Sequence, residues 1–125
     1  MRRFLLLLCA LLRACSVPAE LVLNETDNGR FSDVLTGEKV VISLPENRTT
    51  GYSWRFFAVP VGFFADVHEE YIAPNTTLLG AGGVKRYSFT VNSVGRATLT
   101  AFYYRPWEPL DMQKDLRVEF YFTAK

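Results

Sequence analysis

Apolar and polar residues alternate along several short segments of this chain, which is the pattern of β-strands that bury one face. The last segment shows it most clearly, because every second residue from position 116 to position 124 is apolar and most residues between them are polar or charged. We expect one face of this strand to lie in the hydrophobic core. The residues predicted for that face are Leu116, Val118, Phe120, Phe122 and Ala124.

Other segments repeat this alternation. Val40, Ile42 and Leu44 share one face of a predicted strand, and Tyr52, Trp54, Phe56 and Ala58 share a face of the next, where Trp54 should be core. Further strands are predicted over residues 85–93 and 96–104, with shorter ones near 21–24 and 63–71. No segment longer than about ten residues has a helical stripe. The chain is therefore predicted to be all-β, an immunoglobulin-like, Greek-key β-sandwich.

The first residues have the pattern of a targeting segment. Arg2 and Arg3 precede a run of nine apolar residues that ends at Arg13, whereas a membrane-spanning helix needs about 20. We expect a signal peptide over residues 1–19, cleaved after Ala19, and one domain over residues 20–125. A membrane anchor and a lipoprotein modified at Cys15 are the alternatives. Cleavage implies secretion or transport along the secretory and endolysosomal pathway, without later membrane association.

Cleavage also changes the thiol content and the charge. Cys9 and Cys15 are the only cysteines, so the mature domain would have no disulfide and would depend on its core for stability. Loss of three arginines from the 14 basic residues leaves 11 against 13 acidic ones, a formal charge of about −2. No basic cluster for phosphate binding is present, so nucleic acid is not an expected partner, and we expect a monomer.

Residues for catalysis are scarce. His68 is the only histidine, so neither a zinc site nor a cofactor site is expected. The mature domain has no cysteine nucleophile, and no serine lies in a Gly-x-Ser-x-Gly elbow. Glu69 and Glu70 are neighbours on a predicted strand, so their carboxyl groups point to opposite faces. These observations favour a binding protein over an enzyme.

Three connections between predicted strands have the composition of binding loops. They span residues 46–51, 73–84 and 106–114. In a Greek-key sandwich, alternate connections collect at the same end, so the three loops are expected to form one surface on a rigid scaffold.

The loops carry three short motifs: Asn47-Arg48-Thr49-Thr50-Gly51-Tyr52, Leu78-Leu79-Gly80-Ala81-Gly82-Gly83 and Arg105-Pro106-Trp107. In this order and at these separations they resemble the chagasin family of cysteine-peptidase inhibitors. The signatures of that family are Asn-Pro-Thr-Thr-Gly with an aromatic, Gly-x-Gly-Gly, and Arg-Pro with an aromatic. The resemblance runs from about Gly37 to the C-terminus and implies inhibition of papain-like peptidases, for example cathepsin L-like enzymes.

The resemblance also implies a role for each motif. Residues 49–51 would form the tip of a wedge that enters the active-site cleft, with Gly51 as the residue of closest approach. The glycine-rich loop would contact the non-primed side of the cleft, and Trp107 would stack on the opposite rim. Trp107 could instead pack in the core. Leu79 could fill an apolar pocket of the peptidase, or it could instead pack beneath its own loop. The implied contact residues are Asn47, Thr49, Thr50, Gly51, Tyr52, Leu79, Gly80, Gly82, Gly83, Arg105, Pro106 and Trp107, of which Tyr52 should be mainly structural.

Arg48 departs from the family pattern, because proline is usual at that position. Proline restricts the unbound loop, so arginine is expected to loosen the wedge. The change also creates a glycosylation sequon at Asn47, beside the expected sequons at Asn24 and Asn75.

Two other functions are compatible with a secreted sandwich. One is an immunoglobulin-like adhesion or carbohydrate-binding module that uses a sheet face or other loops. The other is a chaperone-type domain that offers an edge strand to a partner. Neither would depend on Gly51 or Trp107.

Overall fold

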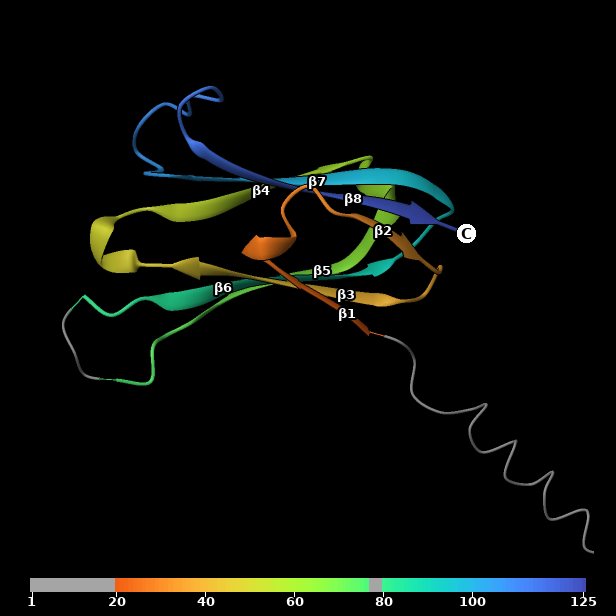
Figure 1. The fold of residues 1–125 in the computed structure, drawn as a ribbon, viewed down its shortest axis with the longest axis horizontal. Helices are drawn as coiled ribbons and strands as arrows, with labels where there is room; N and C mark the ends of the chain where they lie inside the picture. Colours follow the sequence, from red (N-terminus) through yellow and green to blue (C-terminus); the bar gives the residue numbers. More distant parts are fainter. Residues whose placement is uncertain (1–19, 77–79) are drawn as a thin grey trace, which may run out of the picture.

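The computed structural model describes residues 20–76 and 80–125 as a two-layered all-β domain (Figure 1). The expected signal peptide and Leu79 lie outside the described residues. Three single-turn 3-10 helices, η1 (Glu25–Asp27), η2 (Arg48–Thr50) and η3 (Val61–Phe63), interrupt the strands. The strands are β1 (Glu20–Asn24), β2 (Phe31–Val34), β3 (Lys39–Glu46), β4 (Ser53–Val59), β5 (Phe64–Ile72), β6 (Gly83–Val91), β7 (Gly95–Tyr104) and β8 (Leu116–Ala124).

Each layer is a four-stranded sheet. Sheet A has the strand order β1-β3-β6-β5, and sheet B has the order β2-β8-β7-β4. Figure 1 shows the two sheets packed face to face, and the fold is the immunoglobulin-like sandwich predicted from the alternation. Among the described residues, no helix is long and apolar enough to cross a membrane.

The core consists of the inward faces of both sheets. Trp54 is 5% exposed, which confirms its predicted core position. The side chains that are almost completely buried include Phe63, Phe89, Phe120, Phe122, Leu23, Ile42, Leu44 and Leu99. Stacked and edge-to-face contacts among the rings of Phe63, Phe64, Phe89 and Phe122 stabilise one part of this core.

The prediction that Leu116 belongs to the core is wrong, because its side chain is 60% exposed. Leu116 is the first residue of β8 and pairs with Tyr103 where β7 approaches its end. Burial of the alternating face begins only at Val118. Alternation identifies which face of a strand is apolar, but the length over which the other sheet covers that face depends on tertiary packing.

The sequence patterns did not predict β2 or the pairing at two sheet edges. β2 has four residues, and the exposed Phe31 lies on its outward face. β1 pairs with β3, and β2 pairs with β8, in parallel. Neither short strand has enough alternation to reveal its partner.

The topology places the three predicted loops together. The β3–β4, β5–β6 and β7–β8 connections lie at one end of the sandwich, and the C-terminus lies at the other (Figure 1). The prediction of a shared end is therefore confirmed, and all three loops extend from paired strands of the sandwich.

Candidate functional site

The β3–β4 connection, which we call the wedge loop (residues 47–51), is closed by its own hydrogen bonds. Asn47 caps η2, with its side-chain Oδ1 accepting bonds from the Thr49 amide at 3.1 Å and the Thr49 hydroxyl at 2.6 Å. The Thr50 hydroxyl donates to the Asn47 carbonyl at 2.8 Å. Gly51 ends the turn with a φ of 83°, a left-handed conformation that favours glycine. The short loop is therefore held in one shape before any partner arrives.

Gly51 has a second structural requirement, which is its contact with Trp107. A Cβ atom built on Gly51 would overlap the outer edge of the Trp107 ring. The tryptophan therefore lies directly on the glycine backbone while its side chain remains 71% exposed. This exposure excludes the alternative in which Trp107 packs in the core. The wedge loop and the β7–β8 loop present a joint surface with an exposed aromatic ring at its centre.

Arg105 links the same two loops through polar contacts. Its Nε donates to the Thr50 carbonyl at 3.3 Å, and its guanidinium carbon lies 4.7 Å from the centre of the Tyr52 ring. Tyr52 is half-buried and packs on Tyr103, with ring centres 5.4 Å apart. Arg105 and Tyr52 therefore support the loops from the side, and the neighbouring Pro106 is exposed.

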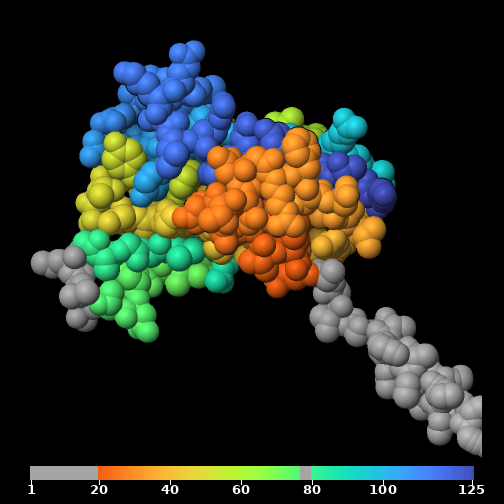
Figure 2. Space-filling model, viewed as in Figure 1, coloured from red at the N-terminus to blue at the C-terminus, as the bar shows by residue number. Residues whose placement is uncertain are grey.

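Asn47 links the wedge loop to the glycine-rich β5–β6 loop. Its side-chain Nδ2 donates to the Gly80 carbonyl at 2.9 Å, and its backbone amide donates to the Tyr103 hydroxyl at 3.0 Å. Gly82 is exposed beside Asn47, whereas Gly83 is buried in β6. In the space-filling view, the wedge loop region (yellow) lies between the β7–β8 loop (blue) and the β5–β6 region (green) (Figure 2). The predicted residues that the structure describes thus gather at one end, with Gly83 beneath the surface.

The structure adds two exposed apolar residues that the sequence patterns did not assign to this surface. Met112 is 62% exposed in the β7–β8 loop, and Leu116 is 60% exposed at its end. Leu116 lines a hollow of about 440 Å³ beside the wedge loop, together with Tyr52, Tyr103 and Arg105. Met112 could have been found from the sequence, because it is an apolar residue inside a polar loop. Leu116 could not, because the alternation of β8 predicts that its side chain faces the core.

The segment that carries Met112 is held by reciprocal hydrogen bonds. The Asp111 carboxylate accepts bonds from the Gln113 amide at 3.0 Å and the Lys114 amide at 3.2 Å. The Asp115 carboxylate accepts from the Asp111 amide at 2.7 Å. Both carboxylates are therefore used to shape the turn, which leaves Met112 and Leu116 as its outward-facing apolar groups.

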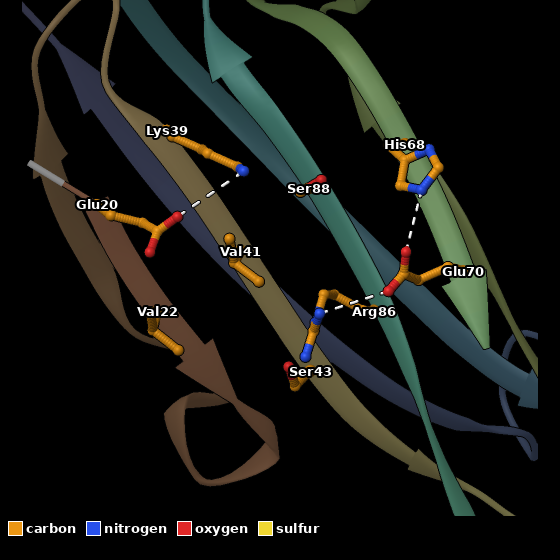
Figure 3. Close-up of a pocket in the computed structure, with 9 residues that line it drawn as sticks. All are labelled: Glu20, Val22, Lys39, Val41, Ser43, His68, Glu70, Arg86 and Ser88. Atoms are coloured by element: carbon orange, nitrogen blue, oxygen red, sulfur yellow. Dashed lines mark hydrogen bonds and ion pairs between the residues drawn. The ribbon is translucent and has the colours of Figure 1, made fainter. Parts of the chain in front are cut away.

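A second hollow, of about 390 Å³, lies on the outer face of sheet A (Figure 3). Its polar side chains pair with one another. Lys39 lies 3.9 Å from Glu20, and Glu70 lies 3.4 Å from Arg86 and 3.1 Å from His68. In residues 20–76 and 80–125, no three His, Cys, Asp or Glu residues are arranged to hold a metal ion. This face therefore offers paired surface charges rather than a reactive centre.

Comparison with known proteins identifies the group to which these features belong. The sequence profile of the chagasin family of peptidase inhibitors, I42, matches residues 33–123. Chagasin of Trypanosoma cruzi is 36% identical over 88 residues, covering 67% of this chain and 80% of chagasin.

Two solved structures have the same fold. The cysteine protease inhibitor EhICP2 of Entamoeba histolytica superposes with a TM-score of 0.78 at 20% identity, covering 88% of this chain and 99% of its own. Leishmania mexicana ICP superposes with a TM-score of 0.57 at 25% identity, covering 88% of this chain and 91% of its own. With the sequence match spanning β2 to β8 and all three loops at one end, the chain belongs to the chagasin family of peptidase inhibitors.

Proposed function

We propose that this protein inhibits papain-like cysteine peptidases reversibly, by inserting the wedge loop into the active-site cleft while the two flanking loops grip its rims. The observation that carries the proposal is the exposed Trp107 ring seated on the Gly51 backbone, beside a wedge that is hydrogen-bonded to both flanking loops. Inhibition is the activity of the family, and the family is not one of enzymes.

The geometry explains how binding becomes tight without a covalent bond. Loops that are ordered only on binding lose conformational entropy, which subtracts from affinity. Here the wedge loop is closed by its Asn47 cap, and Asn47 and Arg105 tie it to its neighbours. Most of the entropy of ordering is therefore lost during folding rather than during binding.

Titration of residues 20–125 against papain tests the proposal directly. We expect inhibition at a one-to-one ratio, competition with a small substrate, and recovery of peptidase activity after dilution. A protein that leaves papain fully active, or that is cleaved within residues 47–51 while activity persists, would rule out occlusion by the wedge loop.

No observation favours the two rival functions over inhibition. A ligand of the sheet A hollow would have to compete with the ion pairs Lys39–Glu20 and Arg86–Glu70. Ligand binding on that face, or pairing of a partner with an edge strand, would not depend on the contact between Gly51 and Trp107. Loss of inhibition upon changes to these two residues therefore discriminates between inhibition and both rivals.

Leu116→Ser is expected to weaken inhibition of papain about fivefold, because burial of a leucine on the enzyme contributes about 1 kcal/mol when the side chain is only partly covered. The folded domain should melt at nearly the same temperature, since Leu116 is already 60% exposed. Val94→Ser is the matched control, because Val94 is 70% exposed in the β6–β7 connection at the other end. Equal inhibition by the parent and Leu116→Ser would show that the peptidase does not contact the hollow lined by Leu116.

We further propose that the protein enters the secretory pathway, with the mature chain starting at Glu20, and that it carries sugar at Asn24 and Asn75. Both asparagines are exposed. Asn47 differs, because its Nδ2 already donates to the Gly80 carbonyl at 2.9 Å and lies between two loops.

Sugar on Asn47 is expected to abolish tight binding, since the nitrogen that would carry the glycan joins the wedge loop to its neighbour. To test this, the protein is secreted from eukaryotic cells and captured on immobilised papain whose active site is accessible. Mass spectrometry then measures the glycan occupancy of Asn47 in the captured fraction. The captured fraction should lack sugar at Asn47, whatever the occupancy at Asn24 and Asn75. A captured fraction glycosylated at Asn47 would contradict the proposed placement of the wedge loop.

A further inference from the structure

A buried carboxylate lies at the base of the wedge loop. Glu46, the last residue of β3, is 1% exposed. Its Oε1 accepts a hydrogen bond from the Trp54 amide at 2.9 Å, and its Oε2 accepts one from Arg48 Nε at 3.1 Å. A buried carboxylate is tolerated only with such partners, so the two ends of the β3–β4 connection are tied together through Glu46.

The arginine that pairs with Glu46 also lies on an aromatic ring. The guanidinium carbon of Arg48 is 3.9 Å from the centre of the Tyr71 ring, on edge strand β5 of sheet A. Arginine is suited to this double contact, because its planar group can stack on a ring while its N–H groups donate in the plane. Arg48 therefore connects the wedge loop to β5 as well as to β3.

Gly83 provides the space for this arrangement. It pairs directly with Glu46 in the β3–β6 ladder. A Cβ atom on Gly83 would overlap the Tyr71 ring and the Ile72 carbonyl. The last glycine of the Gly-x-Gly-Gly motif therefore has a structural role within the domain, because its missing side chain leaves room for the Tyr71 ring that Arg48 contacts.

We propose that Glu46, Arg48 and Tyr71 form a clamp that positions the wedge loop for insertion into the peptidase cleft, and that Arg48 stiffens the loop through its side chain where the family signature uses a proline. The inference rests on the proposed function. Arg48 is a positioning residue here, since its contacts are made with Glu46 and Tyr71 inside the domain.

The backbone conformation at position 48 would accept a proline, so the effect of the Arg48 side chain can be compared directly with the stiffening effect of proline. Arg48 is the first residue of η2, a position where proline is well accepted, and Asn47 before it is extended, with φ −106° and ψ 100°. Arg48→Pro therefore removes the clamp without straining the turn. If only backbone stiffness matters, this variant inhibits more tightly. If the clamp positions the loop, it inhibits less tightly, because Glu46 remains buried without its cation.

Inhibition constants for papain should be measured for the parent, Arg48→Pro, Glu46→Gln and the double variant. We expect Arg48→Pro to weaken inhibition at least about tenfold in the parent background. In the Glu46→Gln background, where no buried charge is left unpaired, the same change should have an effect within about threefold. Arg55→Gln is the matched control, because Arg55 also lies over an aromatic ring, that of Phe57, but outside the wedge loop.

Amide hydrogen exchange of the free protein separates positioning from general stability. The Thr50 and Gly51 amides donate to the carbonyls of Asn47 and Arg48 at 3.2 and 3.1 Å. In Arg48→Gln these two amides should exchange at least about tenfold faster, while core amides of β6 and β7 keep their protection. Uniformly faster exchange would indicate a stabilising role only and would overturn the positioning role.

The outcomes also distinguish this inference from the proposed function. A parent protein that does not inhibit papain refutes the function, and the exchange experiment then still decides whether the clamp orders the loop. A parent that inhibits, with Arg48→Pro equal or tighter, refutes the clamp and leaves the function intact.

Discussion

Trp107→Ala is expected to weaken inhibition of papain about 30-fold, which corresponds to about 2 kcal/mol for an aromatic anchor at the centre of an interface. Trp107 is 71% exposed in the free protein, so most of its side chain is available for burial against a partner. Its removal creates no cavity in the core, and the melting temperature should change little. Inhibition constants and thermal melts of the parent and the variant provide the measurement.

The control for this change is an aromatic residue of similar exposure elsewhere. Phe31 is 78% exposed and stacks on Tyr121, with ring centres 4.6 Å apart, on sheet B outside the three loops. Phe31→Ala should leave the inhibition constant unchanged. Equal effects of Phe31→Ala and Trp107→Ala on inhibition would show that Trp107 is not an anchor.

Gly51→Asn is expected to have the larger effect, a loss of about 100-fold in inhibition, because it alters the wedge tip and displaces the neighbouring anchor. Asparagine accepts the left-handed conformation that Gly51 adopts at φ 83°, so backbone strain contributes little. Its Cβ, however, would overlap the Trp107 ring and force the ring off the wedge loop.

Gly37→Asn controls for the backbone conformation alone. Gly37 has a φ of 93°, and a Cβ there would meet no atom within 4 Å. This variant should keep full inhibition. In the Trp107→Ala background, Gly51→Asn should lose clearly less than in the parent, because the ring it displaces is already gone. If the losses of inhibition caused by Gly51→Asn and Trp107→Ala simply added in the double variant, displacement of the Trp107 ring would not explain the effect of Gly51→Asn.

Local sequence patterns were sufficient to predict the fold class and the outline of the site. Alternation placed Val118, Phe120 and Phe122 on a core face, since a strand with one buried face requires an apolar residue at every second position. It also separated the buried Trp54 from the exposed Trp107, which follows a proline in a loop. Three motifs at strand connections predicted the binding end, because alternate connections of a sandwich meet there.

Tertiary structure decided what the local patterns could not contain, namely contacts between residues far apart in the chain. Leu116 has the parity of a core residue, yet sheet A does not cover the start of β8, so it is exposed. The sequence predicts that Arg48 loosens the wedge loop, because arginine leaves the backbone freer than the proline of the family signature would; the contacts of its side chain are not visible in that pattern. Its partner Glu46 is only two residues away, but the burial of Glu46 depends on the folded sandwich. Its other partner, the ring of Tyr71, becomes a neighbour only when β3 and β5 pair with β6 in one sheet.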